Sequence, residues 1–115
     1  IKKIFFHLLL LKQHYIKMSL FFFIREIFLM SNSSFKPTVI AGPCLAESYE
    51  IMEEVCESLK SLSDELGFQL IFKASFDKAN RSSFSSFRGY GLEKTLFWFS
   101  ELKRKYQLEI LTDVH

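Results

Sequence analysis

Short apolar runs alternate with longer amphipathic stretches over most of the chain. The runs at residues 38–41, 68–74 and 108–112 are rich in β-branched, aromatic and leucine side chains. Runs of this length, bounded by turn-forming or polar residues, are typical of buried strands. The first run ends at Gly42-Pro43, a dipeptide that marks a tight turn. We therefore predict three strands, the first of them buried in a sheet.

Two amphipathic helices are predicted between these strands. Apolar residues recur at three- and four-residue spacing over residues 51–66 and again over residues 92–106, which gives each segment one apolar face. Ser48 precedes the first segment, and its hydroxyl can accept a hydrogen bond from a free N–H of the first turn. Gly67 follows the last apolar residue and is the usual residue at a helix end.

The order of these elements predicts an α/β fold. Strands that alternate with helices indicate parallel βαβ units, and parallel strands need cover on both faces. Three strands and two helices therefore correspond to the opening part of a doubly wound sheet or of a (β/α)8 barrel, and the fold is incomplete. In both architectures the chemistry gathers at the carboxyl ends of the strands. Residues 42–47, 73–90 and 113–115 occupy those ends.

The first 29 residues differ in composition from the rest. Ile, Lys, Phe and Leu dominate them, and charged side chains repeatedly interrupt the apolar runs. A transmembrane helix needs about 20 consecutive apolar residues, so we expect no stable membrane insertion. A signal peptide and a membrane-surface helix are alternatives, but no small-residue cleavage site follows. We interpret residues 1–29 as a non-native or unstructured extension and residues 30–115 as the N-terminal part of a synthase domain, in a chain that looks cut at both ends.

Charge and cysteine content narrow the function classes. The net charge is +2, but residues 1–29 hold five basic side chains and one acidic one, which leaves ten basic against twelve acidic in residues 30–115. This balance argues against a nucleic-acid partner. The two cysteines fit neither a disulfide framework nor a CxxC motif, so a reducing, cytoplasmic environment is expected.

The segment from residue 73 to residue 91 is too long for an ordinary βα loop, which usually has about 2–6 residues. It sets four basic side chains against a single Asp77, together with hydroxyl and amide donors. Ammonium, guanidinium and hydroxyl groups together suit the oxygens of phosphates and carboxylates. The segment is thus either an anion-binding site or a solvated surface loop. The candidate ligands are Lys73, Lys78, Asn80, Arg81, Ser82, Ser83 and Arg88.

Two further strand ends carry reactive side chains. Cys44 follows the first strand and is a packing residue, a nucleophile with His115 as its base, or a metal ligand. Asp113 and His115 are two residues apart and point the same way, which suits contacts with sugar hydroxyls or acid–base work. Cys56 lies beside the apolar face of the first helix, so we expect it in the core.

Four motifs together resemble the family of 3-deoxy-D-manno-octulosonate 8-phosphate synthases. They are IAGPC at 40–44, KASFDKANRSS at 73–83, FRG with a further glycine at 87–91, and LTDVH at 111–115. The KASFDKANRSS run is the most specific of them, whereas the related 3-deoxy-heptulosonate 7-phosphate synthases share the GPC turn. Ser85 and Tyr90 depart from the histidine and the proline that the family commonly has there.

The resemblance implies the first three strands and two helices of a (β/α)8 TIM barrel. It implies an enzyme of lipopolysaccharide precursor synthesis, homo-oligomeric when complete, that condenses phosphoenolpyruvate with arabinose 5-phosphate and releases phosphate. This chain alone is expected to be inactive. A heptulosonate synthase-like enzyme is one alternative, although it would carry a shorter Lys-Pro-Arg-Thr type segment. A non-catalytic remnant of a truncated gene is the other.

The resemblance also assigns roles to the candidate residues. Lys73 and Lys78 would face the phosphoenolpyruvate carboxylate and the reacting centre, and Asp113 would meet sugar hydroxyls. These three are the expected catalytic residues, and the sugar phosphate would be held by Asn80, Arg81 and Ser82. Cys44 would place the chain with the metal-dependent class, as one ligand of a divalent metal whose remaining ligands lie beyond His115.

Overall fold

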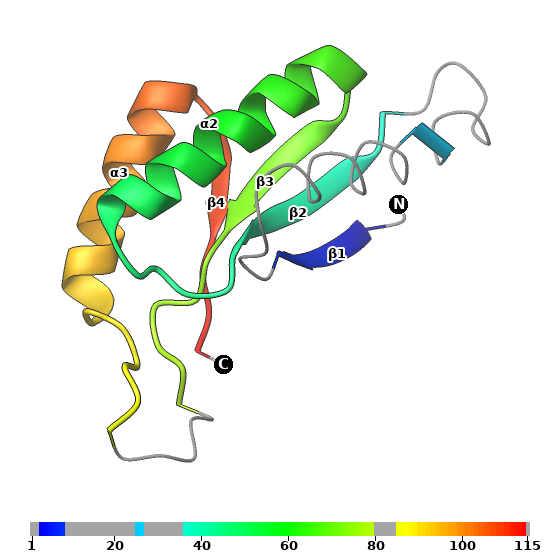
Figure 1. The fold of residues 1–115 in the computed structure, drawn as a ribbon. Coiled ribbons are helices and arrows are strands. Elements are labelled where there is room, and N and C mark those ends of the chain that lie inside the picture. The colour runs from blue at the N-terminus through cyan, green and yellow to red at the C-terminus, as the bar shows by residue number, and fades with distance from the viewer. Residues whose placement is uncertain (1–2, 9–24, 27–35, 80–84, 115) are drawn as a thin grey trace.

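In the residues that the structure describes, a parallel sheet carries two long helices (Figure 1). The computed structural model describes residues 3–8, 25–26, 36–79 and 85–114. The strands pair in the order β1-β2-β3-β4, and every pairing is parallel. This arrangement confirms the predicted α/β class and the three predicted strands. The elements are β1 (Lys3–Leu8), β2 (Thr38–Pro43), α2 (Tyr49–Leu66), β3 (Gln69–Lys73), α3 (Leu92–Tyr106) and β4 (Glu109–Leu111).

Both predicted ends of α2 are confirmed. Ser48 has an extended backbone, and its side chain accepts a hydrogen bond from the Ile51 N–H at 3.2 Å. Gly67 adopts a left-handed conformation with φ 73°, and its N–H donates to the Ser63 carbonyl at 2.8 Å. Glycine takes this conformation without the steric penalty of a Cβ atom. These two caps define the helix that connects the end of β2 to the start of β3.

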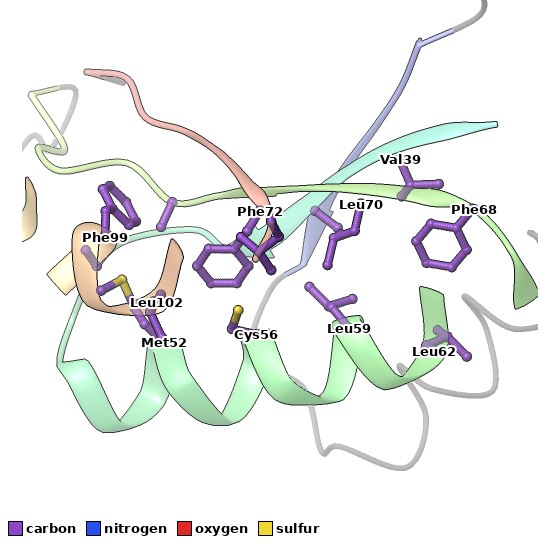
Figure 2. Packing of buried hydrophobic residues seen from close by; sticks show 14 residues of the cluster. Val39, Met52, Cys56, Leu59, Leu62, Phe68, Leu70, Phe72, Phe99 and Leu102 are labelled. Carbon is purple, nitrogen blue, oxygen red and sulfur yellow. The ribbon is translucent and has the colours of Figure 1, made fainter. Parts of the chain in front are cut away.

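The hydrophobic core lies between the helices and one face of the sheet. Figure 2 shows Met52, Cys56 and Leu59 of α2 pointing toward Leu70 and Phe72 of β3, and all five side chains are buried. Burial raises the pKa of the Cys56 thiol to about 12. The expectation that Cys56 packs in the core is therefore confirmed.

The predicted apolar face of α3 is confirmed at Phe99 and Leu102 but is wrong over the first turns of the helix. Leu92 and Leu96, both predicted to face the core, are 45% and 48% exposed. Thr95 is buried instead, and its hydroxyl donates to the Gly91 carbonyl at 2.8 Å, so this buried polar group keeps a hydrogen-bond partner. The buried side chains of this helix are Thr95, Phe99 and Leu102.

Strand β1 was not predicted. It lies along β2 in parallel register, with Lys3 opposite Thr38 and Leu8 opposite Pro43. We expected residues 1–29 to be non-native or unstructured, but six of them form a strand that pairs with the edge of β2. The rest of that segment, apart from residues 25–26, lies outside the described residues, so its interpretation as a non-native extension stays a prediction. Within the described part of the chain, no helix is long and apolar enough to cross a bilayer.

Candidate active site

The segments that follow β2, β3 and β4 meet at the carboxyl-terminal end of the sheet, because the ends of parallel strands lie on the same side (Figure 1). Backbone hydrogen bonds hold these segments together. The Ser75 N–H donates to the Cys44 carbonyl at 3.3 Å, and the Phe76 N–H donates to the Asp113 carbonyl at 3.1 Å. The first few residues after each of the three strands therefore form one continuous platform.

Four polar side chains gather on this platform, and we call Lys73, Ser75, Lys78 and Asp113 the lysine–aspartate cluster. Both lysine ammonium groups donate to Ser75 Oγ at 3.1 Å. The Ser75 hydroxyl in turn donates to Asp113 Oδ1 at 2.5 Å, and Lys73 Nζ lies 3.1 Å from the same carboxylate oxygen. One hydroxyl thus connects both lysines to the carboxylate.

The cluster keeps an excess of positive charge in a buried setting. Lys73 and Lys78 are only 7% and 3% exposed, and Ser75 is fully buried. Buried ammonium groups need hydrogen-bond partners or counter-charges to offset their lost hydration. The Asp113 carboxylate balances one of the two ammonium charges, which leaves a net charge of +1. A site of this kind attracts an anion, and low solvent access strengthens that attraction.

Asp113 stays ionised in this environment. Its partial burial raises its pKa, but hydrogen bonds from Ser75 and Lys73 and the charges of both lysines outweigh that effect. The pKa of Asp113 therefore lies below its ordinary value. Its side chain is 42% exposed, so the carboxylate also faces the solvent from which a hydroxyl-bearing ligand would arrive.

The long loop after β3 is closed by an internal ion pair. Arg88 donates from Nε to Asp77 Oδ1 at 2.9 Å and from Nη2 to Asp77 Oδ2 at 2.7 Å, a two-pronged geometry that is stronger than a single contact. The Lys78 N–H also donates to the Arg88 carbonyl at 2.9 Å. Arg88, which we had grouped with the candidate anion ligands, therefore joins the end of the loop to its start.

Gly42 explains the GPC turn in structural terms. A Cβ atom at this position would lie 2.0 Å from the Lys73 carbonyl oxygen and 2.9 Å from the carbonyl carbon. Any side chain would therefore collide with the backbone of β3 at Lys73. The glycine permits the close approach of β2 and β3 that places Lys73 in the cluster.

Cys44 is partly exposed at the end of β2, and its thiol forms no disulfide. A transition-metal site needs several donors of suitable type. In the described residues, no group of three or more His, Cys, Asp or Glu side chains is placed to hold a metal ion. Cys44 is thus a single candidate sulfur donor, and the described residues do not form a metal site by themselves. The metal therefore stays a prediction, and His115 lies outside the described residues.

Of the residues singled out in the sequence, the structure brings Lys73, Lys78 and Asp113 together. Their roles toward a substrate stay predictions. Asn80, Arg81 and Ser82, expected to hold the sugar phosphate, lie outside the described residues.

Ser75 was not singled out from the sequence. The sequence offers one indication of its role: side chains alternate along an extended chain, so residues 73 and 75 point to the same side.

Comparison with known proteins places the chain in a family. The model of the DAHP synthetase I family matches residues 30–115. Proteins named 2-dehydro-3-deoxyphosphooctonate aldolase are 52% identical in Fusobacterium nucleatum and 49% identical in both Helicobacter hepaticus and Brucella ovis. Each match covers 77 residues, or 67% of this chain and 28% of the relative, so the chain spans little more than a quarter of their length. The chain belongs to the DAHP synthetase I family.

Proposed function

We propose that this chain is the N-terminal part of a cytoplasmic, homo-oligomeric enzyme that condenses phosphoenolpyruvate with D-arabinose 5-phosphate. The products would be 3-deoxy-D-manno-octulosonate 8-phosphate and inorganic phosphate. The lysine–aspartate cluster carries the proposal, because two buried ammonium groups and one carboxylate stand at the carboxyl ends of adjacent parallel strands. The name shared by the relatives supports the same reaction.

The charges of the cluster suit the enol phosphate. Lys73 and Lys78 together carry one more positive charge than Asp113 balances, which matches one substrate carboxylate. Because both ammonium groups are buried, their attraction for that carboxylate is screened less than it would be in water. The lysines would bind the enol phosphate and hold it in one orientation. The partly exposed Asp113 would accept a hydrogen bond from a hydroxyl of the sugar.

The reaction joins C3 of phosphoenolpyruvate to the aldehyde carbon of the sugar. The aldehyde oxygen takes up a proton, water adds at C2, and the bond between C2 and the phosphate oxygen breaks. The carboxylate of phosphoenolpyruvate takes no part in these bond changes, so the lysines can hold it throughout. A divalent metal at Cys44 would supply Lewis-acid chemistry, but the described residues offer one donor, and we derive no step through it.

The test uses a full-length hybrid enzyme. In it, the matched residues of this chain replace the aligned segment of the Fusobacterium nucleatum relative, because the chain spans 28% of that protein. We expect phosphate release that requires both substrates. Lys73→Met and Lys78→Met should each lower kcat/KM about a hundredfold, since each removes a charged contact worth about 3 kcal/mol.

The matched control is Lys60→Met, which removes a lysine that pairs with Asp64 on the surface of α2. It should leave turnover unchanged. A folded hybrid that releases no phosphate would overturn the proposal. A preference for a four-carbon aldose phosphate over arabinose 5-phosphate would favour the heptulosonate synthase alternative instead.

A further inference from the structure

We propose that Ser75 is a positioning residue that fixes the two lysine ammonium groups of the site without touching the substrate itself. The identity of the substrate rests on the proposed function. The placement of the lysines by Ser75 does not, because it follows from hydrogen bonds within the described residues.

The hydroxyl of Ser75 has no capacity left for a ligand. A serine hydroxyl offers one hydrogen and two lone pairs. The hydrogen goes to Asp113 Oδ1 at 2.5 Å, and the two lone pairs accept from Lys73 and Lys78 at 3.1 Å each. The residue is also fully buried. A substrate atom could bond to this oxygen only by displacing one of the three partners.

The backbone of Ser75 is held by hydrogen bonds to the segment that follows β2. Its N–H donates to the Cys44 carbonyl at 3.3 Å, and its carbonyl accepts from the Ala46 N–H at 3.0 Å. These bonds belong to a parallel bridge between Leu45 and Ser75. The Ser75 oxygen is attached to this fixed backbone through Cβ alone, with one rotatable side-chain bond, so its position is well defined. The ammonium groups, by contrast, sit at the ends of flexible four-carbon stems.

The two lysines depend on Ser75 to different degrees. Lys73 has its own ion pair with Asp113 at 3.1 Å, which survives removal of the hydroxyl. Lys78 is joined to the cluster by its hydrogen bond to Ser75. We therefore expect Ser75→Ala to release Lys78 while Lys73 stays in place. A serine that merely fills space in the core would show no such asymmetry.

The experiment compares Ser75→Ala and Ser75→Thr in the hybrid enzyme, with Ser63→Ala as the matched control. Ser63 is a buried serine near the end of α2, away from the carboxyl ends of the strands where the cluster lies. Ser75→Ala should raise KM for phosphoenolpyruvate about tenfold, the effect of losing one charge-assisted hydrogen bond of about 1.4 kcal/mol. Its melting temperature should fall no further than that of Ser63→Ala. Ser75→Thr keeps the hydroxyl and should recover most of the substrate affinity.

A second measurement needs no turnover. Reductive methylation of the folded hybrid enzyme without substrate, followed by peptide mass spectrometry, reports how freely each lysine reacts. We expect Ser75→Ala to raise the rate at Lys78 several-fold and at Lys73 much less, with Ser63→Ala changing neither. An unchanged rate at Lys78 would overturn the inference, even if KM rises, because the hydroxyl would then act on the substrate directly. A hybrid without activity would overturn the proposed function and leave this measurement valid.

Discussion

The contact between Gly42 and Lys73 predicts how a single methyl group would damage the site. Gly42→Ala adds a Cβ atom 2.0 Å from the Lys73 carbonyl oxygen. Gly42 is absent from the glycines with positive φ in the described residues, so alanine suits its backbone conformation. The substitution therefore tests steric crowding between β2 and β3 and nothing else.

The overlap sets the size of the effect. Carbon and oxygen atoms in close backbone contact normally stay about 3.3 Å apart, so β2 and β3 must separate by about 1.3 Å at this point. Backbone hydrogen bonds near 2.9 Å do not survive a separation of that size. Overpacking costs about 1–3 kcal/mol, and each lost hydrogen bond about 1 kcal/mol more, so we expect a loss of about 3 kcal/mol. A shift of about 1 Å in Lys73 would lower the rate about a hundredfold.

Unfolding and turnover of the hybrid enzyme measure both effects. The matched control is Gly67→Ala, the same change at a glycine where an added Cβ meets nothing within 4 Å. That control carries only the penalty of its positive φ, about 1 kcal/mol, and should keep full activity. The reasoning is refuted if Gly42→Ala has the same free energy of unfolding as Gly67→Ala and the same turnover rate as the unmodified hybrid.

Four more outcomes are expected. The pKa of Asp113 lies below its ordinary value of 3.8, so its carboxylate stabilises the fold at pH values above 3.8, and this stability is lost as the pH falls through the pKa of the folded state. Asp113→Asn should therefore flatten the dependence of the free energy of unfolding on acid pH, measured by urea unfolding. Iodoacetamide should label native Cys44 well before Cys56, whose pKa is about 12, and equal rates would contradict the burial of Cys56. A chelator should abolish the activity of the hybrid, and added divalent metal should restore it. Cys44→Ala should lose both metal and activity, whereas Cys44→Asn should recover some activity without metal. Full activity without bound metal would refute the metal assignment. The 115-residue chain alone should aggregate and release no phosphate, because β4 ends the sheet with exposed Leu111 and Val114; a soluble monomer with a cooperative melt would count against this.

The elements with local signals were predictable from the sequence. The caps of α2 depend on Ser48 and Gly67 alone, and each acts on backbone groups within four residues of itself. The strands β2, β3 and β4 follow from apolar runs of the right length. In α3, periodicity indicated Phe99 and Leu102 correctly but favoured Leu92 and Leu96 over Thr95, whose hydroxyl is bonded to the Gly91 carbonyl, a contact that hydrophobic periodicity does not register.

The site was predictable only in part, for a related reason. Lys73, Lys78 and Asp113 belong to residue types and strand ends that indicate anion chemistry. The role of Ser75 depends on three side chains from two strand ends meeting at one oxygen, which no spacing along the chain encodes. Strand β1 is similar, because its segment becomes a strand only through pairing with β2, more than thirty residues away.

The position of β1 has a consequence for how a complete ring of strands would close. Each edge of a strand accepts one neighbour, and β1 occupies the edge of β2 that faces away from β3. In a closed (β/α)8 barrel, that edge of the first barrel strand is the seam where the eighth strand docks. In this chain residues 3–8 fill the seam. A chain that continues to an eighth strand has to release them before its ring can shut.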